Sequence, residues 1–147
     1  MTIEERQHAL LSMREQHHRT CPVCGDQNPT NGLHTAFEVR PDGVVEAEVT
    51  YGEDKEGYDG HLHGGILAAL LDGAMTNCLF SYGIPAVTGE LAVRMVCPVR
   101  AGPKVVVRAW LHRRFSQLYL MNAELRQGVV VAAKGKGKFM QMAAEKT

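Results

Sequence analysis

The chain has 147 residues, of which 45% are hydrophobic and 22% are charged, as in an ordinary globular protein. Its 16 basic residues equal its 16 acidic residues, so no net field draws it to nucleic acid or to an anionic membrane. No apolar run approaches the roughly 20 residues of a membrane-spanning helix, and the N-terminal segment lacks the positive charge and apolar centre of a signal peptide. We therefore expect one domain over residues 1–147, located in the cytoplasm.

The first expected element is an amphipathic helix over residues 3–18, within an N-terminal segment of residues 1–20. Its apolar members are Ile3, Leu10, Leu11 and Met13. The charged residues between them, Arg6 included, are expected to face solvent.

A loop over residues 21–32, with the sequence CPVCGDQNPTNG, follows and is rich in turn-forming residues. Its two cysteines, Cys21 and Cys24, are expected to be reduced thiols in a cytoplasmic protein. A structural zinc site requires four ligands, and the Cys-x-x-Cys pair supplies only two. Loose candidates for further ligands are His17, His18 and His34. We favour a tight turn here and predict no bound metal.

The rest of the chain alternates in a simple order. Two strands flank the turn signal RPDG, one long helix over about residues 65–82 follows, and everything after it is strand. The four later strands are expected at residues 87–99, 104–115, 118–127 and 129–142. Because the long helix is apolar on nearly every side, it must be surrounded, which predicts an antiparallel sheet curled around it. The outer face of that sheet also needs cover, which predicts oligomerisation.

The long helix carries one carboxylate, Asp72, within the segment GYDGHLHGGILAALLDGAM. An ionised carboxylate without partners is costly to bury, so this acid should be paired, protonated or facing a cavity. Thr76, four residues later, lies on the same face and can hydrogen-bond it. At the helix start, His-Gly-Gly leaves backbone N–H groups free and open to close approach, which suits an oxyanion hole at Gly65. The alternative is an acid that only orders the core.

The spacing between these two features suggests a second copy of the chain. Gly65 and Asp72 are seven residues apart, which is about 10 Å along one helix. Attack on a carbonyl requires both groups within about 3 Å of the reacting atoms. Two antiparallel helices related by a two-fold axis satisfy that requirement, so we expect a homodimer with two composite sites.

Taken together, these motifs resemble the phenylacetate-degradation (PaaI-like) group of hotdog-fold acyl-CoA thioesterases. In that group His-Gly-Gly is followed by an acid nine residues after the histidine, as Asp72 follows His63. The segments CPVCGDQNPTNGL and TGELAVRMVCPVRAG resemble the group's opening motif and third strand. The resemblance implies an α+β hotdog fold, in which an antiparallel sheet wraps around one long central helix, with an extra N-terminal helix here. It also implies dimers and often tetramers.

The resemblance further implies hydrolysis of acyl-CoA thioesters, with coenzyme A as part of the substrate and no cofactor. Asp72 would be the nucleophile or general base, and the Gly65 amide would polarise the thioester carbonyl. His63 would line the entrance, and Thr76 would orient Asp72 or the attacking water. Further substrate contacts are expected at Gly64, Tyr58, Asp59 and Arg94.

Two other functions stay open. Some members of the group carry an asparagine near the reacting water, six residues before the histidine, where this chain has Gly57. Its absence keeps open a non-catalytic acyl-CoA-binding module. Another hotdog chemistry, such as hydration of enoyl thioesters, would need a histidine and an acid acting on the β-carbon. The acyl group and the basic residues that contact the coenzyme A phosphates are not determined by the sequence.

Overall fold

The computed structural model describes residues 1–27 and 32–142. Residues 28–31 of the predicted loop and residues 143–147 lie outside this description. The elements are α1 (Ile3–His17), β1 (Glu38–Val39), β2 (Val45–Val49), the short 3-10 helix η1 (Glu53–Lys55), α2 (Gly64–Phe80), β3 (Ala86–Met95), β4 (Val105–Phe115), β5 (Leu118–Gln127) and β6 (Val130–Gln141). The predicted order of one helix, two strands, one long helix and four strands is confirmed.

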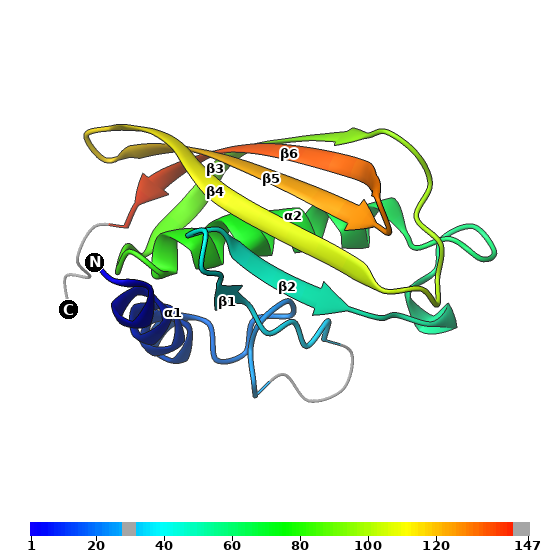
Figure 1. The fold of residues 1–147 in the computed structure, drawn as a ribbon, viewed down its shortest axis with the longest axis horizontal. Coiled ribbons are helices and arrows are strands. Elements are labelled where there is room, and N and C mark those ends of the chain that lie inside the picture. Colours follow the sequence, from blue (N-terminus) through cyan, green and yellow to red (C-terminus); the bar gives the residue numbers. More distant parts are fainter. Residues whose placement is uncertain (28–31, 143–147) are drawn as a thin grey trace.

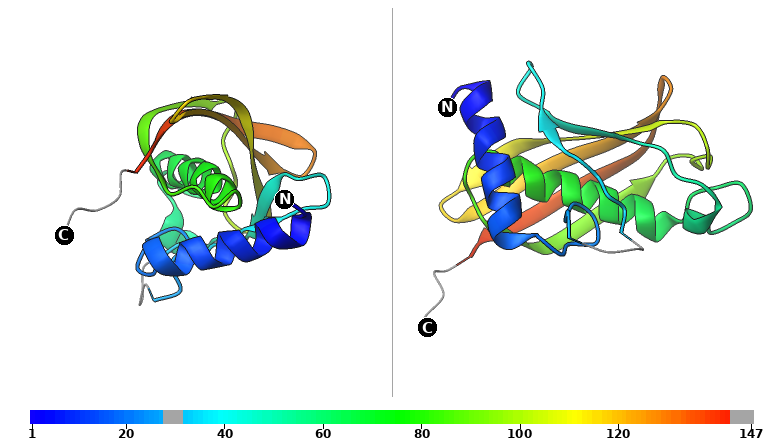
Figure 2. Two further views of the ribbon diagram at one scale, coloured as in Figure 1. Left: turned by 90° about the vertical axis from the view of Figure 1, so that its left-hand side faces the viewer. Right: turned by 90° about the horizontal axis from the view of Figure 1, so that it is seen from below.

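The described strands form one antiparallel sheet in the order β1-β2-β4-β5-β6-β3. This sheet curls over α2, while α1 lies on the opposite side of that helix (Figure 1). The view along α2 in Figure 2 shows the helix enclosed between the two layers. The long helix therefore lies at the centre of the molecule, as its apolar sequence predicts.

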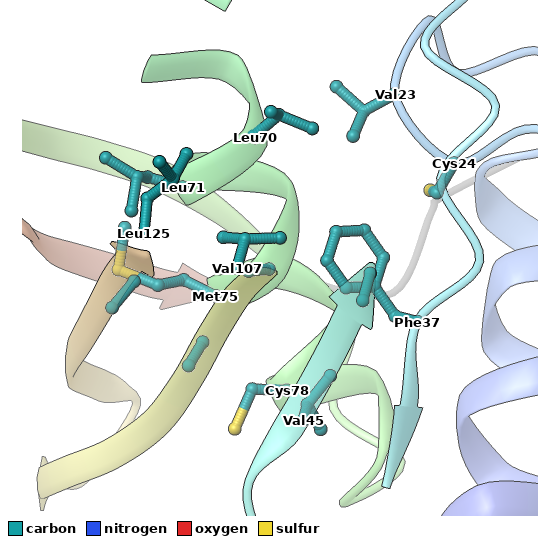
Figure 3. Packing of buried hydrophobic residues seen from close by; sticks show 14 of the residues in the cluster. Val23, Cys24, Phe37, Val45, Leu70, Leu71, Met75, Cys78, Val107 and Leu125 are labelled. Carbon is teal, nitrogen blue, oxygen red and sulfur yellow. The ribbon is translucent and has the colours of Figure 1, made fainter. Parts of the chain in front are cut away.

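On the side of α2 that faces β5 and β6, the helix packs through apolar side chains. Leu71 and Met75 are fully buried, and their side chains point toward Leu125 of β5 (Figure 3). Two glycines on β6 allow this close approach. A Cβ on Gly135 would lie 3.3 Å from the Leu71 Cβ, and one on Gly137 would lie 3.1 Å from the Met75 sulfur. Larger residues at either glycine would push the helix off the sheet.

The opposite side of α2 is covered by α1 and the Cys-x-x-Cys loop. Arg6 of α1 was expected to be exposed, and that expectation is wrong. This side chain is only 6% exposed, because its guanidinium joins three segments. It donates 2.8 Å hydrogen bonds to the Gly43 carbonyl and the Ser81 hydroxyl, and it lies 4.1 Å from the centre of the Tyr82 ring. A paired and stacked guanidinium is tolerated inside a protein, whereas an isolated one is not.

The two edges of the sheet differ in length. The β1 edge has two residues, whereas the β3 edge has ten, and most of the β3 side chains are exposed. Among them are the apolar residues Val87, Leu91 and Met95. A long exposed edge with apolar side chains is a template for pairing with another strand. Within the described residues, neither helix combines the length and apolar character needed to cross a membrane.

Candidate active site

The start of α2 lies at the surface. His63 is the N-cap residue of the helix, and Gly64 and Gly65 after it are exposed. The Gly65 amide, predicted to polarise a carbonyl, donates a 2.8 Å hydrogen bond to Nδ1 of His63. Within the described residues, the Gly64 amide has no hydrogen-bond acceptor. The predicted anion-binding tip thus has one free amide and one covered by the His63 ring, which must turn aside before Gly65 can meet a ligand.

Gly57 is explained by the position of this histidine. A Cβ on Gly57 would lie 3.2 Å from Cδ2 of His63 and 3.3 Å from its Cα. An asparagine side chain here would therefore press against the ring that covers the Gly65 amide. Gly57 leaves room for the His63 ring.

Asp72 lies in the middle of α2 and is half-buried. Its Oδ1 accepts a 2.6 Å hydrogen bond from the hydroxyl of Thr88 on β3. Burial raises the pKa of Asp72 above its usual value, and the bond from Thr88 partly offsets this rise. The acid is thus held by a single short hydrogen bond in a partly dry environment, which is the setting of a general base.

Thr76 was expected to hydrogen-bond Asp72, but Thr88 of β3 does so instead. Thr76 is 6% exposed, and no hydrogen bond joins it to Asp72 in the described structure. The pairing of β3 with β6 shifts register between Thr88 and Glu90, at Gly89. Such a bulge re-aims the neighbouring side chain, so a threonine beside a glycine within a strand was the signal for Thr88 in the sequence.

The Cys-x-x-Cys loop forms the other wall around Asp72. Cys21 and His18 also influence the pKa of this acid, Cys21 raising it and His18 lowering it. Val23 packs on α2 directly beside the acid, at Gly73, where a Cβ would lie 2.6 Å from the Val23 Cγ1. The absence of a side chain at Gly73 therefore lets the loop pack closely on the helix.

A mostly apolar cavity of about 610 Å³ opens beside the helix start. Gly64 and Tyr58, two of the expected substrate contacts, line it together with Leu67 and the segment 95–99. The predicted contacts Asp59 and Arg94 are exposed and are not part of its lining. The cavity has the size and apolar character of a small-molecule site, with the free Gly64 amide at its wall.

Asp72 is not part of this lining either. It lies on the same unbroken helix as Gly65, so about 10 Å separates the two along the axis. Each chain therefore carries an acid at one place and an amide-rich tip at another. The two predicted halves of the site are not brought together within one chain.

Comparisons with known proteins agree with this architecture. The sequence model of the thioesterase superfamily matches residues 59–132, which include His63, Gly65 and Asp72. No curated protein matches the chain.

Three solved structures show the fold. The PaaI protein of the E. coli phenylacetic acid degradation operon has a TM-score of 0.76 at 17% identity, over 93% of this chain and 96% of that one. Zebrafish thioesterase superfamily member 2 has a TM-score of 0.73 at 17% identity, over 97% of this chain and 99% of that one. The protein smu.793 of Streptococcus mutans, solved with bound acetyl CoA, has a TM-score of 0.68 at 16% identity, over 76% of this chain and 91% of that one. The predicted α+β hotdog fold is confirmed.

Proposed function

This chain belongs to the thioesterase superfamily, and we propose that it hydrolyses acyl-CoA thioesters to the free acid and coenzyme A. Asp72 carries the proposal, because it is a half-buried acid with a raised pKa on the helix whose start presents amides. The acetyl CoA bound to the Streptococcus mutans protein of the same fold supports a coenzyme A thioester as the substrate. Coenzyme A is part of the substrate in this reaction.

In the proposed reaction, the thioester carbonyl oxygen accepts hydrogen bonds from the amides of Gly64 and Gly65 once His63 has turned aside. Asp72 removes a proton from water while the water oxygen bonds to the carbonyl carbon, whose π electrons move to oxygen. Collapse of this intermediate breaks the C–S bond, and the departing thiolate takes the proton from Asp72. In the competing route, Asp72 itself attacks and forms an anhydride that water then hydrolyses.

Single-turnover hydrolysis in H₂¹⁸O separates these routes. Direct attack places ¹⁸O in the Asp72 carboxylate when water opens the anhydride at the protein carbonyl, whereas base catalysis leaves that side chain unlabelled. Mass spectrometry of the peptide that contains Asp72 reads the outcome. Label in the peptide with an unlabelled product acid would favour the anhydride, whereas label in the product acid alone would fit base catalysis.

We place the two halves of the site on two copies of the chain, joined through the β3 edge. Thr88 at one end of β3 contacts Asp72, while Met95 at the other end lies beside Gly64, its methyl 3.8 Å from a Cβ placed there. Antiparallel pairing of two β3 strands over their full length sets Thr88 of each copy near Met95 of the other. The same pairing carries Asp72 of each copy toward the start of the other copy's α2.

Complementation between two inactive variants tests this arrangement. Asp72→Asn removes the acid, and Gly65→Pro removes the amide while keeping a residue that the first helical turn accepts. A mixed dimer then has one site with both defects and one intact site. We expect co-expressed, doubly tagged mixed dimers to recover about half of wild-type activity. A site within one chain predicts no recovery.

The hydrolase assignment itself is tested with a panel of acyl-CoAs and a thiol-reactive dye. We expect thiol release from at least one acyl-CoA, and a fall of about 10³-fold in kcat/KM for Asp72→Asn with substrate binding retained. Asp26→Asn, which changes an exposed carboxylate of the neighbouring loop, is the matched control and should leave the rate unchanged. Unchanged hydrolysis by Asp72→Asn would remove this acid from the mechanism.

One observation favours a second candidate, a non-catalytic acyl-CoA-binding module. The Gly65 amide is already engaged by His63, and Gly57 stabilises that arrangement by leaving room for the ring. In a binding module His63 would stay in place and no thiol would be released. Tight binding of acyl-CoA by the wild-type protein without any thiol release would establish this candidate over the hydrolase.

A further inference from the structure

Three side chains that bind metals in other proteins converge beside α2, outside the proposed reaction. His18, Cys21 and Cys24 each offer one ligand atom, and these atoms all lie within 4.8 Å of one another. Nδ1 of His18 lies 3.5 Å from Sγ of Cys24. A tetrahedral zinc ion, with Zn–S near 2.3 Å and Zn–N near 2.0 Å, separates its ligand atoms by roughly 3.5–3.8 Å. The cluster therefore needs only small movements to close on an ion.

The turn that carries the cysteines is built around the Cys21 sulfur. The Val23 amide donates a 3.4 Å hydrogen bond to that sulfur, and the Gly25 amide closes the turn on the Cys21 carbonyl at 3.0 Å. A Cβ on Gly25 would lie 2.5 Å from the Cys21 nitrogen and 2.6 Å from the Arg19 carbonyl oxygen. Only glycine fits there, so the fifth residue of CPVCG is part of the same construction.

The two cysteine sulfurs are soft ligands of the kind that zinc and cobalt prefer, and each would bind the metal as a thiolate. The second sulfur belongs to Cys24, which is 4% exposed and lies in the turn beside α2 (Figure 3).

The histidine is also held by contacts outside the turn. His18 is the C-cap residue of α1, and its amide donates a 2.8 Å hydrogen bond to the Arg14 carbonyl. Its ring packs edge-on against Phe80 of α2, with 4.9 Å between the ring centres. The two other histidines that the sequence offered are not in the cluster. The ligands thus come from the end of α1 and from the turn that follows it, and the Cys21 amide joins the two by a 3.1 Å hydrogen bond to the His18 carbonyl.

We propose that His18, Cys21 and Cys24 bind one zinc ion, which joins the end of α1 to the loop that covers Asp72 and Gly73. Three protein ligands leave the fourth position for water. The proposal revises the expectation of no metal, which rested on finding too few ligands near Cys-x-x-Cys in the sequence. It does not depend on thioester hydrolysis.

Cobalt substitution tests the site directly. Reduced protein titrated with Co²⁺ should develop the near-ultraviolet thiolate-to-cobalt absorption and the intense visible bands of a tetrahedral site, saturating at one ion per chain. Cys21→Ser, Cys24→Ser and His18→Gln should each lower the affinity at least tenfold. The matched controls are Cys97→Ser and His17→Gln, which change the same residue types outside the cluster and should bind as the wild type does.

A measurement on the wild-type chain keeps the proposal testable if the variants unfold. Bound Zn²⁺ should slow alkylation of Cys21 and Cys24 at least tenfold relative to chelator-treated protein, while alkylation of Cys97 stays unchanged. Absence of the thiolate bands in reduced protein, or bands that persist in the cysteine variants, would overturn the metal site. A disulfide between Cys21 and Cys24 that forms with Zn²⁺ present would also overturn it and indicate a redox pair.

Discussion

The two sides of α2 are packed by different means. Toward β5 and β6, Leu71 and Met75 pack against glycines and apolar side chains. Another face of the same helix presents Asp72, Gly73 and Asn77. There Asp72 accepts a hydrogen bond from Thr88 at the sheet edge, Asn77 donates to the Gly73 carbonyl, and Gly73 contacts Val23 of the loop. The two sides of α2 therefore contribute differently to the molecule. The sheet side supplies stability, and the loop side holds an acid in a partly dry environment.

The strongest way to sharpen this comparison is to remove bulk from the sheet side. Met75→Ala should destabilise the fold by about 3 kcal/mol, because it leaves a cavity between α2 and β6. Thiol release per folded molecule should stay within a few-fold of wild type, since Asp72 is held by Thr88 of β3 and not by Met75. Urea unfolding followed by circular dichroism measures the first quantity, and an acyl-CoA assay at low temperature measures the second. A loss of activity as large as that of Asp72→Asn would show that the packing of Met75 also determines activity.

On the loop side, Gly73→Ala tests whether close contact limits the fit. The new methyl group would clash with Val23, at a cost of about 2 kcal/mol, while better helix propensity returns about 1 kcal/mol. We expect a net loss of about 1 kcal/mol, measured by urea unfolding. Val23→Ala should restore most of it when combined with Gly73→Ala. Additive effects in this double-mutant cycle would contradict the contact.

A smaller effect is expected from the hydroxyl that holds the acid. Thr88→Val keeps the shape of the side chain and removes its hydrogen bond to Asp72, which normally lowers the pKa of that acid. The rate should fall several-fold, and the acidic limb of the pH–rate profile should move to higher pH. Thr50→Val, at an exposed position of the loop after β2, is the matched control. A pH profile that does not move would mean that Thr88 does not set the ionisation of Asp72.

The smallest effect concerns stability. Because the pKa of Asp72 is raised in the folded chain, the folded state binds more protons than the unfolded state between the two pKa values. Stability from this group is therefore full below the unfolded pKa of about 3.9 and is lost as pH rises through the folded pKa. Asp72→Asn should raise Tm at pH 7 by about 2 °C, and the gain should vanish near pH 3. A variant that melts lower than wild type at pH 7 would contradict this sign.

Much of the architecture follows from periodicity in the sequence. The apolar run that became α2 required surroundings on every side, and the turn signals around it separated the strands correctly. Arg6 was misjudged because helical spacing does not reveal that a guanidinium can bond a carbonyl and a hydroxyl on two other segments. Local pattern identifies which residues are apolar, but it does not count the hydrogen bonds available to a buried polar group.

The site was predicted less completely, and each miss is a long-range contact. Thr88 lies 16 residues beyond Asp72 in the chain and reaches it only because β3 runs alongside α2. His18 joins the cysteines only because α1 ends where Phe80 supports its ring. Spacing along the helix favoured Thr76 as the hydrogen-bond partner of Asp72. Distance along the sequence did not distinguish the three histidines that could join the cysteines. Tertiary packing determines both the partner of Asp72 and the histidine that lies beside the cysteines.

The unequal edges of the sheet have a consequence for how copies of this chain can associate. Pairing through β3 uses up the single long edge of each copy, and the two-residue β1 strand, backed by α1, leaves little to extend from. Growth by strand addition would therefore stop at two, which gives a closed particle rather than a fibril. In the proposed dimer, the short opening hairpin would therefore prevent further strand addition.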